Sequence, residues 1–318
     1  MGTQETARDL LSWFGLTESG EQVGRPVSGH RSSALVPCEG HDGRTFLLKI
    51  FEPPALGRFY PPEIRFEDFA RREAAFYRFL ETYDPDRRQI HAPRSILIDP
   101  KDPPRWILLE RIQTAPGPKE ESLAQSHVLE LLADVQSIPP ESLWGRRDFP
   151  LNRWDTVSFV DRMRMMYDPL VFVLAEDRWR RSVRFFHDAL RWTETRKPVV
   201  VHGDFTESNL LVDEDDNPFL VDFERLGTGS QDHDFAWFWI HSTRSPEWKR
   251  ELMRKWLMRY QGSDRVRAEW AIRASVVYVA ARKLRFAYLT QGEADPDKGP
   301  SLALFDAALE GGRDFFPG

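Results

Sequence analysis

Apolar positions form short strand-like runs in the middle of the chain and recur at helical spacing towards its end. Runs at 199–201, 210–212 and 219–221 each have the length of a buried strand, and polar segments separate them. The acidic segment 213–217 lies between the last two runs, and we expect it to form a solvated hairpin turn rather than a metal site. The pattern therefore predicts a strand followed by a hairpin.

The same reasoning predicts further strands in the N-terminal part and a mostly helical C-terminal half. Pro- and Gly-rich stretches at 53–63 and 114–121 predict a long loop and a linker. Strands are expected at 45–51, 92–98 and 106–112. Helices are expected at 6–16, 69–80, 125–138, 246–260, 264–290 and 302–309, with two more within 156–192 and another that opens at 232–237.

Composition narrows the class of protein. The chain has 318 residues, of which 41% are hydrophobic and 30% charged, so we expect a globular protein with room for two subdomains. A net charge of −6 gives no support for nucleic-acid binding, and no apolar run approaches the roughly 20 residues of a membrane span. The single cysteine excludes an internal disulfide. No signal peptide is visible, so we expect a cytoplasmic protein, and no protein partner is implied.

Residues with obvious chemistry lie where the apolar runs end. Asp204 follows the first run, Asn209 precedes the second, and Asp222 closes the third. Magnesium prefers hard oxygen ligands, and phosphoryl transfer needs a carboxylate near the attacking hydroxyl. Asp and Asn are common in turns, but the full spacing H-x-D-x-x-x-x-N from His202, followed by a later Asp, is typical of kinase catalytic loops.

Two charged residues occupy apolar positions. Lys49 lies on the same strand face as Leu47 and Phe51, and Glu73 falls on the apolar stripe of the helix expected at 69–80. Each charge is costly to bury alone, so we expect the two side chains to pair. The alternative is a lysine at the strand edge that extends to water.

The segment from His202 to Asn209, together with Val221-Asp222-Phe223-Glu224, resembles the aminoglycoside phosphotransferase and choline kinase group of kinase-like enzymes. Glu224 stands where a protein kinase has Gly, which fits the small-molecule group better. The resemblance covers about 23–290. It implies an α+β, two-lobed protein-kinase-like fold. Residues 1–112 would form a small lobe that contains the sheet, and residues 113–318 a helical lobe, with ATP in the cleft between them.

The resemblance also implies roles for single residues. Asp204 would orient the acceptor hydroxyl and accept its proton. Asn209 and Asp222 would hold Mg²⁺, while Lys49, fixed by Glu73, would anchor the α- and β-phosphates.

Further residues would support the site or bind the nucleotide. His202 would brace the loop, and Asp234 would hold the loop backbone or act as a simple helix cap. The segment 23–38 would form two strands joined by a phosphate loop, although alone it would be interpreted as an ordinary hairpin turn. The nucleotide contacts implied are Ser28, Gly29, Ser32 and Ser33 in this loop and Glu110 and Ile112 at the hinge.

These features predict an ATP-dependent transfer of the γ-phosphate to a hydroxyl of a small molecule, an aminoglycoside-like antibiotic or a metabolite. Mg²⁺ and ATP would be required, and GTP is not excluded. Two alternatives come from other classes: a catalytically silent pseudokinase that binds nucleotide, and a metal-dependent phosphoesterase, for which the other histidines lack metal-site spacing.

The acceptor stays open at this point. A polycationic aminoglycoside would require an acidic cleft, to which Asp204, Glu207, Asp232 and Asp234 could contribute. The arginine-rich segment 156–192 would favour an anionic acceptor if it faced the cleft, although a solvated basic face is the commoner explanation.

Overall fold

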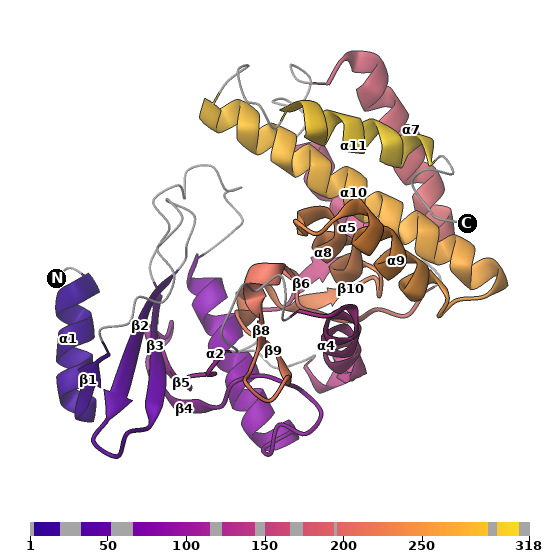
Figure 1. The fold of residues 1–318 in the computed structure, drawn as a ribbon. Coiled ribbons are helices and arrows are strands. Elements are labelled where there is room, and N and C mark those ends of the chain that lie inside the picture. The colour runs from indigo at the N-terminus through magenta and orange to yellow at the C-terminus, as the bar shows by residue number, and fades with distance from the viewer. Residues whose placement is uncertain are drawn as a thin grey trace. The chain divides into compact units, whose positions relative to one another are not determined.

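The computed structural model describes residues 3–19, 33–51, 66–114, 123–143, 150–165, 174–193, 196–291 and 298–311. Its residues group into two compact units (Figure 1). We call Met1–Leu123, Leu143–Pro150 and Leu210–Arg225 the sheet unit, and Ala124–Ser142, Leu151–Asn209 and Leu226–Gly318 the helical unit. The division at residue 112 stays a prediction, but residues 210–225 clearly group with the sheet.

An antiparallel five-stranded sheet in the order β1-β2-β3-β5-β4 forms the sheet unit. The predicted strands at 45–51, 92–98 and 106–112 are present, and the last two are shorter than expected. The strands are β1 (Leu16–Glu18), β2 (Ser33–Gly40), β3 (Thr45–Phe51), β4 (Ser95–Ile98) and β5 (Trp106–Glu110).

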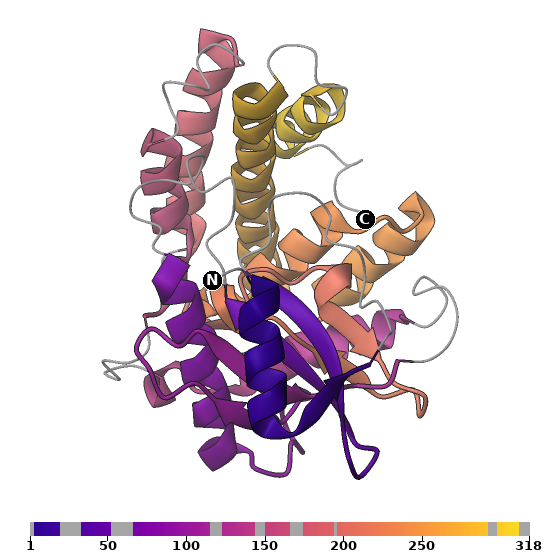
Figure 2. The ribbon, with the colours of Figure 1, turned by 90° about the vertical axis from the view of Figure 1, so that its left-hand side faces the viewer.

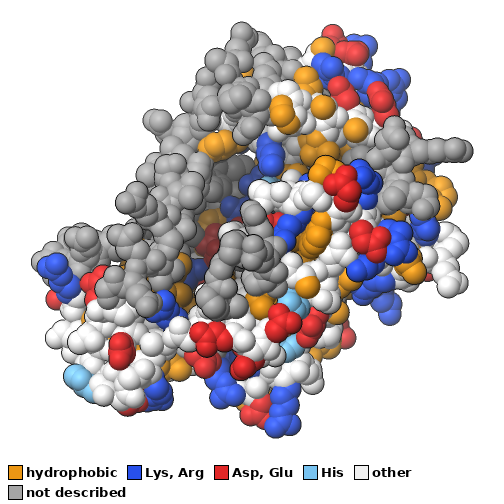
Figure 3. Space-filling view, viewed as in Figure 1, with side chains coloured by type: hydrophobic (Ala, Val, Ile, Leu, Met, Phe, Trp, Pro, Cys, Tyr) orange, Lys and Arg blue, Asp and Glu red, His pale blue; other side chains and the backbone are white. Residues whose placement is uncertain are grey.

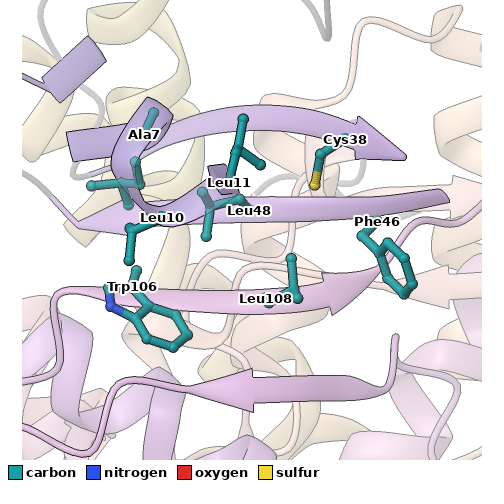
Figure 4. Close-up of a cluster of buried hydrophobic side chains, with 9 residues drawn as sticks. Ala7, Leu10, Leu11, Cys38, Phe46, Leu48, Trp106 and Leu108 are labelled. Carbon is teal, nitrogen blue, oxygen red and sulfur yellow. The ribbon is translucent and has the colours of Figure 1, made fainter. Parts of the chain in front are cut away.

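Helix α1 (Thr3–Phe14) covers one face of this sheet (Figure 2). Leu10 and Leu11 of the helix pack against Leu48, Trp106 and other buried side chains of the strands (Figure 4). Because side chains alternate along β3, a residue next to Leu48 in sequence points to the opposite face. The apolar cluster under α1 therefore directs Lys49 away from α1.

Helix α2 (Phe66–Tyr83) extends three residues beyond the predicted helix at each end and packs against the turn that follows a short hairpin. The hairpin consists of β8 (Leu210–Val212) and β9 (Pro218–Leu220), as the three apolar runs predicted, and is followed by the 3₁₀ turn η4 (Phe223–Arg225). The ring centroids of Phe76 and Phe223 lie 4.4 Å apart, so the end of the hairpin is packed on α2.

A second, three-stranded sheet lies in the helical unit. Its strands are β6 (Asn152–Trp154), β10 (Gly227–Gly229) and β7 (Val199–Val201), with β10 parallel to β6 and antiparallel to β7. Strand β10 is not among the strands expected from the sequence. A Cβ at Gly229 would overlap the carbonyl of Trp154, so only glycine allows β10 to approach β6 this closely.

Helix α10 (Gly262–Gln291) is the centre of the helical unit and packs against α5, α7, α8 and α11 (Figure 1). Small buried residues such as Ala274, Val277 and Ala281 allow the neighbouring helices to approach it. The other helices are α4 (Gln125–Ser137), α5 (Thr156–Met165), α7 (Glu176–Thr193), α8 (His233–His241), α9 (Pro246–Leu257) and α11 (Lys298–Glu310), with 3₁₀ turns at Pro140–Ser142 (η2) and Glu207–Asn209 (η3). Within the described residues, no helix is both long and apolar enough to cross a membrane.

Candidate active site

The loop that follows β7 is fixed by a buried carboxylate of α8. Asp234 accepts hydrogen bonds from the backbone N–H groups of His202, at 2.6 Å, and Gly203, at 2.9 Å. Gly203 has a φ of 78°, which favours glycine, and this conformation turns both amides towards the helix. Burial raises the pKa of Asp234 to about 7, while the bonds from Gly203 and His202 oppose that rise.

The alternative role for Asp234, a simple cap of α8, does not apply. The N-cap residue is Asp232, and its carboxylate turns inward to accept bonds from Trp256 Nε1 at 2.7 Å and the Tyr260 hydroxyl at 3.0 Å. Asp232 also forms an ion pair with Arg196. Both acidic residues are fully buried and committed to contacts inside the helical unit.

Asn209 and Asp204 are joined across the turn of the loop. The side-chain amide of Asn209 donates from Nδ2 to the backbone carbonyl of Asp204 at 2.8 Å. Because the amide nitrogen is used in this way, the Oδ1 atom of Asn209 is the one that can ligate a metal. His202 is fully buried, and its Nδ1 accepts from the N–H of Asp204 at 3.3 Å, which is a bracing role.

The predicted lysine–glutamate pair is present in the sheet unit, together with a second carboxylate. Lys49 Nζ lies 2.6 Å from Glu73 Oε2 and 2.6 Å from Asp222 Oδ1. The strand-edge alternative is wrong, because the lysine side chain is only 5% exposed. Burial by itself lowers the pKa of Lys49, but attraction by Asp222 and Glu73 outweighs it, so the pKa is raised and the ammonium stays charged.

A third carboxylate completes this cluster. Oxygen atoms of Glu73, Asp222 and Glu224 all lie within 4.8 Å of one another. Burial raises the pKa of Glu73 against the opposing attraction of Lys49. Three carboxylates around one ammonium favour a further cation, and oxygen ligands suit magnesium. Asp222, at 33% side-chain exposure against 1% for Glu73, is the carboxylate that an incoming ion can reach.

The sequence interpretation missed a buried arginine next to this cluster. Arg72 donates from Nε to the carbonyl of Pro150 at 2.6 Å and from Nη1 to the carbonyl of Glu224, so it fixes the backbone beside Asp222. The signal was available, because Arg72 lies three residues after Phe69 and four before Phe76, on the apolar stripe of α2.

Several predicted nucleotide contacts are not placed at a site. Ser28, Gly29 and Ser32 lie outside the described residues, and Ser33 is the first residue of β2. At the expected hinge, the amide of Glu110 donates to the carbonyl of Arg94 at 2.8 Å, and Ile112 follows the end of β5. These assignments stay predictions.

Two arginines of α7 form ion pairs with acidic residues of α11. Arg178 contacts Asp306 at 3.1 Å, and Arg181 lies 3.6 Å from Asp306 and 3.7 Å from Glu310. Side chains of both charges lie together over α7 (Figure 3). These ion pairs fit the expectation that segment 156–192 has a solvated basic face better than the expectation that it binds an anionic acceptor.

A histidine-based metal site finds no support in the described part of the chain. There, the only group of His, Cys, Asp or Glu close enough to share a metal is the carboxylate cluster of Glu73, Asp222 and Glu224. Since it contains no histidine, it does not have the ligand set that the phosphoesterase alternative requires.

Comparisons with known proteins agree with the kinase-like arrangement. The sequence model of a family described as "Phosphotransferase enzyme family" matches residues 34–270. No curated protein matches the chain. Solved structures are similar over nearly the whole length, and they confirm the predicted fold class.

Three of these structures show the extent of the similarity. A thermostable mutant of aminoglycoside phosphotransferase APH(4)-Ia with ADP and hygromycin B has 14% identity and a TM-score of 0.60, with 96% of this chain and 98% of that chain covered. The gentamicin–APH(2")-IIa complex has 16% identity and a TM-score of 0.60, with 99% and 97% covered. The GDP complex of aminoglycoside 2'-phosphotransferase-IIIa has 12% identity and a TM-score of 0.59, with 98% and 99% covered.

Proposed function

Because residues 34–270 match its sequence model, the chain belongs to the phosphotransferase enzyme family, and from this premise we propose that it transfers the γ-phosphate of ATP or GTP to a hydroxyl group of a small molecule. The observation that carries the proposal is the buried contact of Lys49 with both Glu73 and Asp222. An ammonium fixed in this way is a preorganised partner for the α- and β-phosphates.

The chain's own residues account for each part of the reaction. Asp204 orients the acceptor hydroxyl and takes its proton as the oxygen attacks the γ-phosphorus. The bond between the γ-phosphorus and the β–γ bridging oxygen breaks, and the nucleoside diphosphate leaves. Asp234 keeps the loop backbone in place, so Asp204 is already oriented before the acceptor binds.

Magnesium fits the oxygen ligands that the chain offers. Asp222 and the Oδ1 atom of Asn209 would hold the ion, and Glu224 lies near Asp222. When bound, magnesium neutralises charge on the phosphates.

The active phosphotransferase and the catalytically silent pseudokinase predict different results in one assay. The test is release of ADP or GDP from the magnesium nucleotide against a panel of hydroxyl compounds. The panel includes aminoglycosides such as hygromycin B and gentamicin, which are bound in two of the similar structures, as well as amino-acid alcohols and sugars. We expect turnover with at least one compound and its loss in Asp204→Asn.

A matched control separates catalysis from loss of charge. Asp215→Asn makes the same chemical change in the exposed turn at 213–217 and should leave turnover unchanged. Nucleotide binding without turnover on any compound, and without Asp204-dependent hydrolysis of nucleotide, would favour the catalytically silent alternative.

A further inference from the structure

Helix α8 holds the first half of the catalytic loop at two points. Asp234, in the first turn of the helix, accepts a hydrogen bond from the backbone amide of Gly203. One turn later, Phe238 packs on Phe205, which is fully buried, with the two ring centroids 5.9 Å apart. Asp204 lies between these two loop residues, so the path of the backbone is fixed on both sides of it.

A carboxylate in the second half of the loop makes a third contact with this region. Glu207 accepts a hydrogen bond through Oε1 from the hydroxyl of Ser242, the residue that caps the end of α8. Its Oε2 atom accepts from the hydroxyl of Thr243 at 3.2 Å, and Nε of Arg244 lies 3.7 Å from Oε1. The side chain of Glu207 is therefore engaged with the end of α8, which removes it from the candidates for an acidic cleft.

The three contacts have a regular spacing on each partner. The helix contributes every fourth residue from Asp234 to its cap, so the three side chains lie on one face. The loop is contacted at every second residue from Gly203, which is the spacing of side chains on one side of an extended chain. Glu207 is thus the last residue of a series along which the loop follows α8.

Glu207 also begins the 3₁₀ turn η3, which carries Asn209. The backbone amide of Asn209 donates to the carbonyl of Thr206 at 2.9 Å, and its side-chain amide donates to the carbonyl of Asp204 at 2.8 Å. Because Asn209 is bonded to the loop itself, the direction of its Oδ1 atom follows the direction of the turn. The contact of Glu207 with the end of α8 ties this turn to the helix.

We propose that Glu207 is a positioning residue of the phosphotransferase, which holds the turn against α8 through Ser242 so that the Oδ1 atom of Asn209 is presented to magnesium. This inference rests on the proposed function. A carboxylate suits the role, because hydrogen bonds to a charged acceptor are roughly twice as strong as those between neutral groups. Removal of a residue that orients a metal ligand typically weakens metal binding by about 10–100-fold.

The magnesium dependence of nucleotide binding tests this role without an acceptor. Binding of ADP or GDP, whichever the protein prefers, is measured by calorimetry over a series of magnesium concentrations. The magnesium concentration that gives half of the full effect is then compared between variants. We expect Glu207→Ala to need about tenfold more magnesium than the unaltered protein. Its affinity for the nucleotide without magnesium should change little.

Two further substitutions connect the effect to the hydrogen bond. Ser242→Ala removes the donor and should reproduce most of the change seen in Glu207→Ala. In the double variant the increase should be smaller than the product of the two single increases, because both substitutions break the same contact. Glu207→Gln retains an oxygen that can accept from Ser242, so it should restore most of the magnesium affinity.

Asp306→Ala is the matched control. Like Glu207, Asp306 is a partly buried acidic residue of the helical unit with an arginine partner, Arg178, at 3.1 Å. It lies on α11 and is paired with α7 rather than with the catalytic loop. We expect Asp306→Ala to lower the melting temperature and to leave the magnesium requirement unchanged. Thermal melting of every variant checks that each is folded.

The outcomes distinguish this inference from the proposed function. A folded Glu207→Ala variant with an unchanged magnesium requirement would contradict the positioning role, as would an equal increase in Asp306→Ala. Single effects that multiply in full in the double variant would also contradict it. If no acceptor is turned over in a manner that depends on Asp204, the proposed function fails alone, since the binding measurement needs no acceptor. Nucleotide binding that does not respond to magnesium in the unaltered protein would contradict both.

Discussion

Asp222 combines a constrained backbone with a charged contact. Its φ of 70° lies in the left-handed region, which costs a residue with a Cβ about 1–2 kcal/mol, and its side chain reaches Lys49. The bond from Arg72 to the carbonyl of Glu224 holds the chain in this conformation. Such a backbone conformation at a charged, partly exposed residue is typical of functional sites.

Substitutions at Asp222 separate its two properties. Asp222→Ala and Asp222→Gly should both lose turnover by about 10²–10³-fold, because each removes the carboxylate proposed to hold magnesium. Asp222→Gly should be more stable to unfolding than Asp222→Ala by about 1–2 kcal/mol, since glycine adopts this φ without strain. Steady-state kinetics and urea unfolding measure the two effects. An active alanine variant would contradict the magnesium assignment, and equal stabilities would contradict the strain.

The sequence could identify residues whose type disagrees with their position. Lys49 and Glu73 stood out because charged residues occupied apolar positions, and the structure pairs them. Arg72 carried the same signal and was missed, because pairing was sought between opposite charges while its partners are backbone carbonyls. Backbone partners leave no trace in residue type, so the bond from the Gly203 amide to the Asp234 carboxylate could only be inferred through the family resemblance.

At the scale of elements, length decided what could be predicted. The long helices α2 and α10 followed from their periodicity, with ends displaced by a few residues. Strands β6 and β10 have three residues each, which is too short for alternation to be recognised. In addition, the Gly-Thr-Gly sequence of β10 is typical of a loop. Its glycines are needed because β6, which is distant in sequence, approaches them closely.

Gly229 provides a test of this close pairing. Gly229→Ala should destabilise the protein by about 1–3 kcal/mol, because the new methyl group would overlap the backbone of Trp154. Gly299→Ala, near the start of α11, meets nothing within 4 Å and should be neutral or stabilise by up to about 1 kcal/mol. Thermal melts of the two variants give the comparison. Equal melting temperatures would show that β10 and β6 can separate without cost.

On the scale of the whole molecule, family and fold class followed from the catalytic loop and its spacing, while the acceptor did not. Fold by itself does not choose among acceptors.

The division of the chain into units predicts how a fragment behaves. Residues 1–123 contain the five-stranded sheet and α2 but lack two further parts of the sheet unit, Leu143–Pro150 and the hairpin segment Leu210–Arg225. Without this segment Lys49 loses Asp222 and Phe76 loses Phe223, so we expect the fragment not to melt cooperatively. Circular dichroism of the fragment beside the full chain provides the measurement. A sharp thermal transition in the fragment would show that the hairpin is dispensable for folding.

The same hairpin limits how relatives of this protein can recombine. A single crossover between residues 114 and 123 would join an N-terminal half from one parent to a C-terminal half from another. The hybrid would take Lys49, Arg72 and Glu73 from the first parent but Asp222, Phe223 and Glu224 from the second. Such a hybrid is expected to fold well only if the residues from the two parents still fit together in this charge cluster. Hybrids that exchange the C-terminal half must keep this cluster matched on both sides of the join.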